Sequence, residues 1–93
     1  MNEVLEQINE VRQDCGLAPA TELKKGTMGM SCDCPIANTI YDESVMANVE
    51  VGDKEIIVDL ESGEMKFYDT SAAVEAFVKG FDEGLYPEYE EVA

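Results

Sequence analysis

The apolar residues of this chain change their spacing at Ser44, from the period of a helix to the period of a strand. Apolar residues then recur at every second position along 45–51 and along 55–60, and residues 64–68 predict a third strand. Val51-Gly52-Asp53-Lys54 predicts a type II′ hairpin turn, because that turn has glycine at its first central position. Ser62-Gly63 predicts a second tight turn. The pattern therefore predicts a three-stranded antiparallel meander.

The alternation also assigns the faces of the first two strands. We expect the inward face to carry the smaller or branched apolar residues: Val45, Ala47, Val49 and Val51, then Ile56, Val58 and Leu60. We expect the outward face to carry the intervening residues: Met46, Asn48 and Glu50, then Glu55, Ile57 and Asp59.

Helical spacing of apolar residues precedes and follows the meander. Residues 2–15 predict an amphipathic helix that is capped by Asn2 and ended by Gly16. Residues 34–41 predict a short helix with Cys34 as its N-cap and Pro35 at its first position.

A last helix is predicted over residues 71–83. Asp69 or Thr70 would cap it, and Gly84 would end it. The expected fold is α+β: short N-terminal helices, the meander, and a C-terminal helix packed on one sheet face. Ninety-three residues make one small domain, 1–93, with its last few residues disordered.

The charge of the chain excludes several classes of function. There are 21 acidic residues, 6 basic residues and no histidine, so the net charge is −15. Binding to nucleic-acid phosphates or to anionic membranes needs a basic surface. Without histidine the commonest general base is missing, and we expect neither an enzyme nor a cofactor. The acidic N-terminal segment differs from a signal peptide, and no apolar run could span a membrane, so we expect a cytoplasmic protein.

The three cysteines leave one chemical alternative open. Cys32 and Cys34, two positions apart, could hold a soft metal ion together with Cys15, and a thiol at a helix N-terminus could be reactive. A structural zinc site usually has four ligands in two spaced pairs, which this sequence lacks. We therefore interpret Cys34 as a small apolar residue packed at a helix start.

The acidic residues gather in the second half of the chain. Residues 1–41 carry 6 acids and 3 bases, a net of −3, whereas residues 42–93 carry 15 acids and 3 bases, a net of −12. One interpretation is a mimic of duplex DNA that inhibits a nucleic-acid-binding protein. The other is an acidic surface that keeps a small protein soluble.

Exposed apolar and acidic residues are the candidates for a protein interface. Methionine adapts to irregular surfaces, and tyrosine is enriched at interfaces. The candidates are Met28, Met30, Ile57, Asp59, Glu61, Tyr86 and Tyr89. Folding back onto the core is the favoured alternative for Tyr86. The edges of a short meander also leave a homodimer open.

Two stretches of the chain form distinctive motifs. One is the Gly-rich lead GTMGMSCDCPIANTI with its C-P-[ILV]-A core, and the other is the F-D-x-G-x-Y-P signature at Phe81, Asp82, Gly84, Tyr86 and Pro87. Both motifs resemble those of small proteins of actinobacteria and of the phages that infect them. The resemblance implies an intracellular, phage-encoded origin and contributes no catalytic residue. We thus expect a non-enzymatic protein-binding module whose partner is another protein, such as a component of a bacterial host that it modulates.

Overall fold

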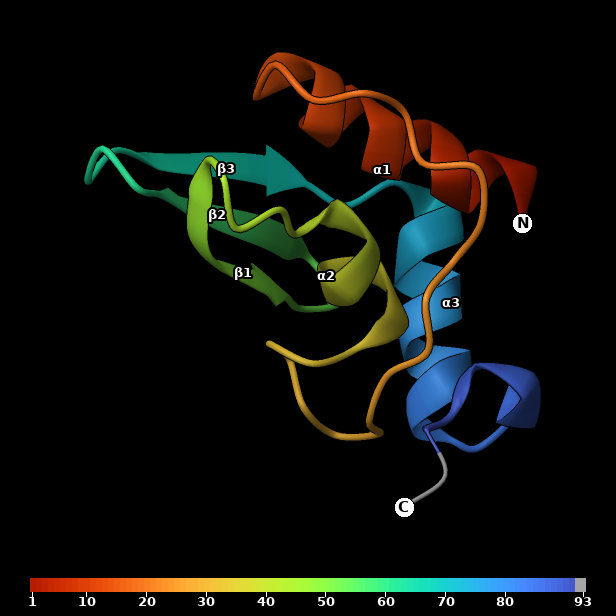
Figure 1. Cartoon of the computed structure of the whole chain (residues 1–93). Coiled ribbons are helices and arrows are strands. Elements are labelled where there is room, and N and C mark those ends of the chain that lie inside the picture. The colour runs from red at the N-terminus through yellow and green to blue at the C-terminus, as the bar shows by residue number, and fades with distance from the viewer. Residues whose placement is uncertain (92–93) are drawn as a thin grey trace.

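Three α-helices cover one face of a three-stranded antiparallel sheet, as the sequence predicts (Figure 1). The computed structural model describes residues 1–91. The strand order is β1-β2-β3. The elements, in chain order, are α1 (Asn2–Asp14), α2 (Pro35–Ile40), β1 (Met46–Val51), β2 (Glu55–Leu60), β3 (Met65–Asp69), α3 (Ala72–Asp82) and the 3₁₀ turn η1 (Pro87–Tyr89).

Helix α1 begins at Asn2, the first residue of the predicted range, but its N-cap differs from the expected one. Met1, and not Asn2, occupies the N-cap position, because the Met1 carbonyl already accepts the Leu5 N–H at 3.0 Å. At the other end Gly16 has a φ of 80°, and the Leu17 N–H reaches back to the Arg12 carbonyl at 2.8 Å. This is the Schellman ending that glycine permits, so the predicted end of the helix is confirmed.

Helix α2 begins as predicted. Cys34 is its N-cap, the Cys34 Sγ accepts the Ala37 N–H at 3.4 Å, and Pro35 is the first helical residue.

Helix α3 has a different cap from the two candidates. The Ser71 hydroxyl accepts the Val74 N–H at 3.2 Å. Asp69 and Thr70 are unsuited to capping because they still belong to the sheet: Asp69 ends β3, and the Thr70 N–H donates to the Lys54 carbonyl.

Strand β1 contains a bulge that reverses part of the predicted alternation. Met46 pairs with Leu60 and Asn48 pairs with Asp59, so Ala47 is an extra residue on β1. Met46 is 0% exposed, whereas Ala47 is exposed. The prediction of an outward Met46 and an inward Ala47 is wrong, because the bulge turns the long Met46 side chain into the core.

The first hairpin turn lies one residue later than predicted. The Gly52 N–H donates to the Glu55 carbonyl at 2.9 Å, and Asp53 and Lys54 form the turn. Gly52 lacks the positive φ that a type II′ turn requires there. The observed register places the buried Val51 opposite the buried Ile56, and not opposite the exposed Lys54.

The core lies between the helices and the inward face of the sheet. Its largest fully buried side chains come from every α-helix and from both β1 and β2, and they include Ile8, Ile36, Ile40, Met46, Ile56, Phe77 and Phe81. Among residues 1–91, no helix combines the length and the apolar character that a membrane span requires.

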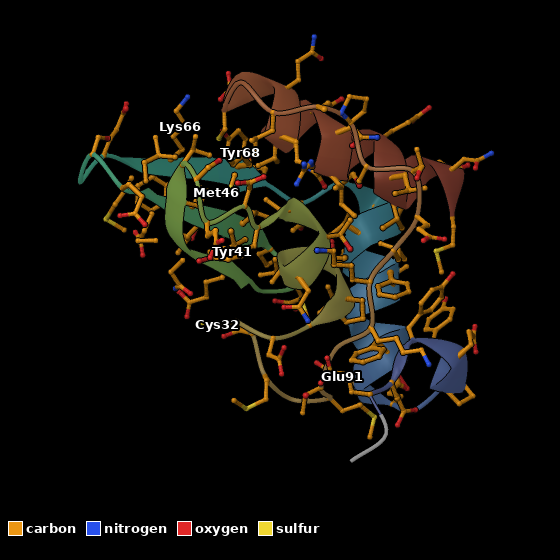
Figure 2. The ribbon with its side chains drawn as sticks, viewed as in Figure 1. Cys32, Tyr41, Met46, Lys66, Tyr68 and Glu91 are labelled. Atoms are coloured by element: carbon orange, nitrogen blue, oxygen red, sulfur yellow. The ribbon has the colours of Figure 1, made fainter. Side chains whose placement is uncertain are left out.

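The C-terminal segment packs against the loop that joins α1 to α2, residues 15–34, which we call the loop before α2. The Gly26 N–H donates to the Tyr89 carbonyl at 2.9 Å, and the Glu91 N–H donates to the Gly26 carbonyl at 3.0 Å. Figure 2 shows Glu91 at the end of the molecule where α3 finishes. The chain is thus held in place as far as Glu91, and the remaining part of the predicted disordered end, Val92 and Ala93, lies outside the described residues.

Candidate functional site

The outward face of the sheet exposes large apolar side chains. Phe67 is 57% exposed and Met65 is 52% exposed, both on β3. Ile57 of β2 lies directly opposite Phe67 and is half-buried. We call these three residues, Ile57, Met65 and Phe67, the apolar centre. Side chains of this size are rarely left together on the surface of a small protein without a partner to cover them.

Carboxylates surround the apolar centre. The register places Glu50 beside Ile57 and Asp59 beside Met65. Glu55 of β2 lies directly opposite Asp69 of β3. Two like charges at facing positions of a sheet destabilise it, and a bound cation would remove that cost. The outward face, Asn48, Glu50, Glu55, Asp59, Asp69 and the apolar centre, contains no basic residue.

The lysines of the acidic half bind carboxylates elsewhere. Lys54 and Lys79 both contact Glu75 of α3, with N–O distances of 2.7 Å and 3.3 Å. Lys66 points to the helix side of the sheet and contacts Asp14 at 3.2 Å. Of the fifteen acidic residues of the second half, Glu75 is the only one in an ion pair within residues 1–91. The carboxylates of the outward face therefore have no ion-pair partner within residues 1–91.

Helix α1 holds β3 in place from the opposite side. The Tyr68 hydroxyl donates to Asp14 Oδ2 at 2.6 Å, beside the Lys66 contact. Figure 2 shows both side chains reaching from β3 toward the C-terminal end of α1. Both hydrogen bonds lower the pKa of Asp14, and the hydrogen bond from Tyr68 has a larger effect than the one from Lys66. The exposed face of β3 thus belongs to a strand that is anchored on its inner side.

The cysteines occupy three separate environments. Cys15 follows α1 and touches the Tyr68 hydroxyl at 4.0 Å, whereas Cys32 is exposed and accepts the Asn48 side-chain N–H at 3.8 Å. Figure 2 shows Cys32 well apart from Tyr68. Within residues 1–91 no three potential ligands of the Cys, Asp, Glu or His type gather in one place. The sequence hypothesis of a metal site on Cys15, Cys32 and Cys34 thus has no geometric support.

Cys34 is buried at the start of α2. Burial raises the pKa of its thiol, and the hydrogen bond from Ala37 opposes this rise only in part. A short helix of six residues supplies little dipole to counter the loss of water. A raised pKa leaves less of the nucleophilic thiolate at neutral pH, which is the opposite of a reactive cysteine.

A cleft of about 450 Å³ opens beside Cys34. It lies between the loop before α2, the β1–β2 turn and α3, and the Gly29 N–H crosses it to donate to Asp82 Oδ1 at 3.1 Å. Its lining is mainly apolar and also includes three acidic residues and one lysine: Met30, Pro35, Ile36, Val51, Phe77, Phe81, Asp53, Asp82, Glu83 and Lys79. Without histidine, and with the Cys34 thiol protonated, this lining contains no strong nucleophile at neutral pH.

The other predicted interface residues lie in different parts of the molecule. Met28 and Met30 are exposed on the loop before α2, and Glu61 is exposed in the turn after β2. Tyr86 packs its ring 4.7 Å from that of Phe77, and Tyr89 lies 5.9 Å from the same ring. Tyr86 therefore folds back onto the core, the favoured alternative for it, and Tyr89 does so as well.

The sequence predicts the outward position of Asn48, Glu50, Glu55, Ile57 and Asp59, and it names Ile57 and Asp59 as interface candidates, but it does not identify Met65 and Phe67. The signal that could have identified them is the alternation of β3 itself, Met65-Lys66-Phe67-Tyr68-Asp69. With Lys66 and Tyr68 directed to the helices, the odd-numbered residues must lie beside Ile57.

Comparison of the chain with protein-family models, with curated proteins and with solved structures finds no match. The resemblance to small actinobacterial and phage proteins thus stays a prediction. The functional proposal below therefore rests on the geometry and the charge of the molecule.

Proposed function

We propose that this protein is a non-enzymatic binding module and that the outward face of its sheet contacts a basic surface of another protein. The observation that carries the proposal is the apolar centre, exposed among carboxylates that have no internal counter-charge. Apolar contact would supply affinity, and the surrounding charge would select a basic partner and speed its approach.

The arrangement favours a protein partner over mimicry of duplex DNA. A mimic needs a continuous array of negative charges at the spacing of phosphates. On this face Ile57, Met65 and Phe67 interrupt the carboxylates. We therefore rank binding of a basic protein above inhibition of a nucleic-acid-binding protein. Under the resemblance to phage proteins, the partner would be a bacterial host protein.

The test compares two single variants in pull-downs from a bacterial lysate. Phe67→Ser removes the one aromatic ring of the apolar centre, and Leu85→Ser removes a side chain that is 66% exposed but lies after α3, away from the sheet. We expect a basic protein to be recovered with the wild type and with Leu85→Ser, and to be lost with Phe67→Ser. Its recovery should fall as salt is raised, because salt screens exposed charges.

Two outcomes would contradict the proposal. Equal recovery with Phe67→Ser and with the wild type would show that the outward face is not the contact surface. Release of the partner by added duplex DNA, with Phe67→Ser still binding, would favour the DNA mimic.

A further inference from the structure

The free edge of β3 has backbone hydrogen-bonding groups without a partner. At the two ends of the β2–β3 ladder, the Leu60 N–H donates to the Glu64 carbonyl, and the Thr70 N–H donates to the Lys54 carbonyl. In an antiparallel pair such bonds recur at every second residue. Lys66 and Tyr68 are therefore the β3 residues whose backbone groups pair with β2. The N–H and C=O groups of Met65 and Phe67 point away from β2.

Two other parts of the sheet edges are occupied. On β1, the Val51 N–H donates to the Ser31 carbonyl at 2.9 Å, so the loop before α2 occupies the end of that edge next to the first hairpin, whereas no hydrogen bond reaches the outer side of Val49 within residues 1–91. At the end of β3, the Gln7 side chain donates to the Asp69 carbonyl at 2.7 Å. Within residues 1–91 no group bonds to the backbone of Met65 or Phe67 on the free side. The open segment thus coincides with the exposed part of the apolar centre.

We infer that the partner docks as an extended, basic segment that adds a fourth strand to the free edge of β3. This inference rests on the proposed function and specifies how the partner binds. Backbone hydrogen bonds to Met65 and Phe67 would give affinity, and alternate side chains would lie beside the apolar centre. Charge complementarity sets the chemistry of the segment, because Glu50, Glu55, Asp59 and Asp69 lie on the same face.

A second copy of this chain fits the edge less well than a basic segment does. Two β3 strands paired about a twofold axis would bring together two molecules that each carry a net charge of −15. No lysine of the sheet faces outward to offset that repulsion, since Lys66 contacts Asp14 on the helix side.

The test begins by selecting from a displayed library of random peptides, each about ten residues long, the length of a long strand. We expect enrichment of peptides in which lysine or arginine alternates with apolar residues. One such peptide is then synthesised and titrated into four proteins: the wild type, Met65→Pro, Met65→Ala and Phe67→Ser. Proline is tolerated at the first position of an edge strand, so Met65→Pro should fold, which its thermal unfolding will verify.

The comparison of Met65→Pro with Met65→Ala isolates the backbone. Both variants lose the methionine side chain, but only proline removes the N–H. Met65→Pro should bind the peptide about five- to tenfold more weakly than Met65→Ala, because it loses one backbone hydrogen bond to the peptide and its ring clashes with the added strand. In addition, the Phe67 amide should exchange slowly with solvent only in the complex, whereas the Lys66 amide should be protected with or without the peptide.

Each contrary result has a separate meaning. Equal binding by Met65→Pro and Met65→Ala, with Phe67→Ser defective, would overturn strand addition and leave the outward face as a docking surface. Unweakened binding by Phe67→Ser would overturn the proposed function itself. If the enriched peptides lacked basic residues, or if no peptide was enriched, the inference of an extended basic segment as the partner would be overturned. Slow exchange of the Phe67 amide in a dimer without peptide would assign the edge to a second copy.

Discussion

At the scale of single residues, Gly26 leaves no room for even one added carbon atom. A Cβ added there would lie 2.5 Å from the Asp33 carbonyl oxygen and 2.6 Å from the Pro35 nitrogen. Both are backbone atoms that cannot rotate away. We predict that Gly26→Ala lowers the free energy of unfolding by about 2 kcal/mol, as measured by urea denaturation.

Gly52→Ala is the matched control. Its added Cβ would meet only the Glu55 carbonyl at 3.7 Å, an ordinary contact, and its φ is not in the left-handed region. We expect little change in its unfolding midpoint. Equal destabilisation by the two substitutions would mean that the close approach at Gly26 does not hold the loop against α2.

At the scale of elements, the link between α1 and β3 should depend on pH. Tyr68 holds the pKa of Asp14 below its ordinary value of 3.8. A lowered pKa stabilises the fold above the ordinary value, and the contribution is lost as the pH falls through the folded value. We predict that Tyr68→Phe unfolds at a lower urea concentration at pH 7 and that its deficit shrinks as the pH falls through the folded pKa of Asp14, because the protonated carboxyl no longer gains from the Tyr68 hydrogen bond as a carboxylate.

Tyr41→Phe controls for the loss of a hydroxyl. Tyr41 is 40% exposed, and its hydroxyl makes no hydrogen bond within residues 1–91. It should unfold like the wild type throughout this pH range. A deficit for Tyr68→Phe that stays constant from pH 7 down to a pH at which the Asp14 carboxyl is seen to be protonated would show that Asp14 is not responsible.

Elements whose ends depend on one local residue could be predicted from the sequence. Gly16 ended α1 and Pro35 started α2 as expected, because each acts through its own backbone conformation. The bulge at Ala47 could not be predicted in this way, since it depends on how Met46 fits the core against other elements. The alternation of residues in β1, taken alone, predicts an outward Met46 and an inward Ala47, the opposite of what is observed.

In the candidate site, too, features that depend on one strand could be predicted from the sequence, and features that depend on contacts between elements could not. The position of Ile57 on the outward face follows from the alternation of a single strand. Its place opposite Phe67 follows only from the register between β2 and β3. The open backbone edge depends further on what α1 and the loop before α2 cover. These features arise from tertiary packing, which no single stretch of sequence encodes.

At the scale of the whole molecule, the net negative charge lowers the stability of the free protein and would favour the binding of the proposed basic partner. The chain carries a charge of −15, and the outward face brings Glu55 directly opposite Asp69, neither of which has an ion-pair partner within residues 1–91. Such an arrangement is unfavourable in the free protein and favourable once a basic partner is bound. A protein whose acidic surface served solubility alone would have no need to place like charges at facing positions of its sheet.

Glu55→Gln should therefore make the free protein more stable and the complex weaker. Removing one of the facing charges should raise the free energy of unfolding by about 0.5 kcal/mol at low salt, with a smaller gain at high salt. Affinity for the basic peptide should fall at low salt. Glu88→Gln, an exposed carboxylate of η1 away from the sheet, removes the same charge and should change both quantities less. If the two variants shifted stability and affinity equally, overall charge and not the outward face would govern binding.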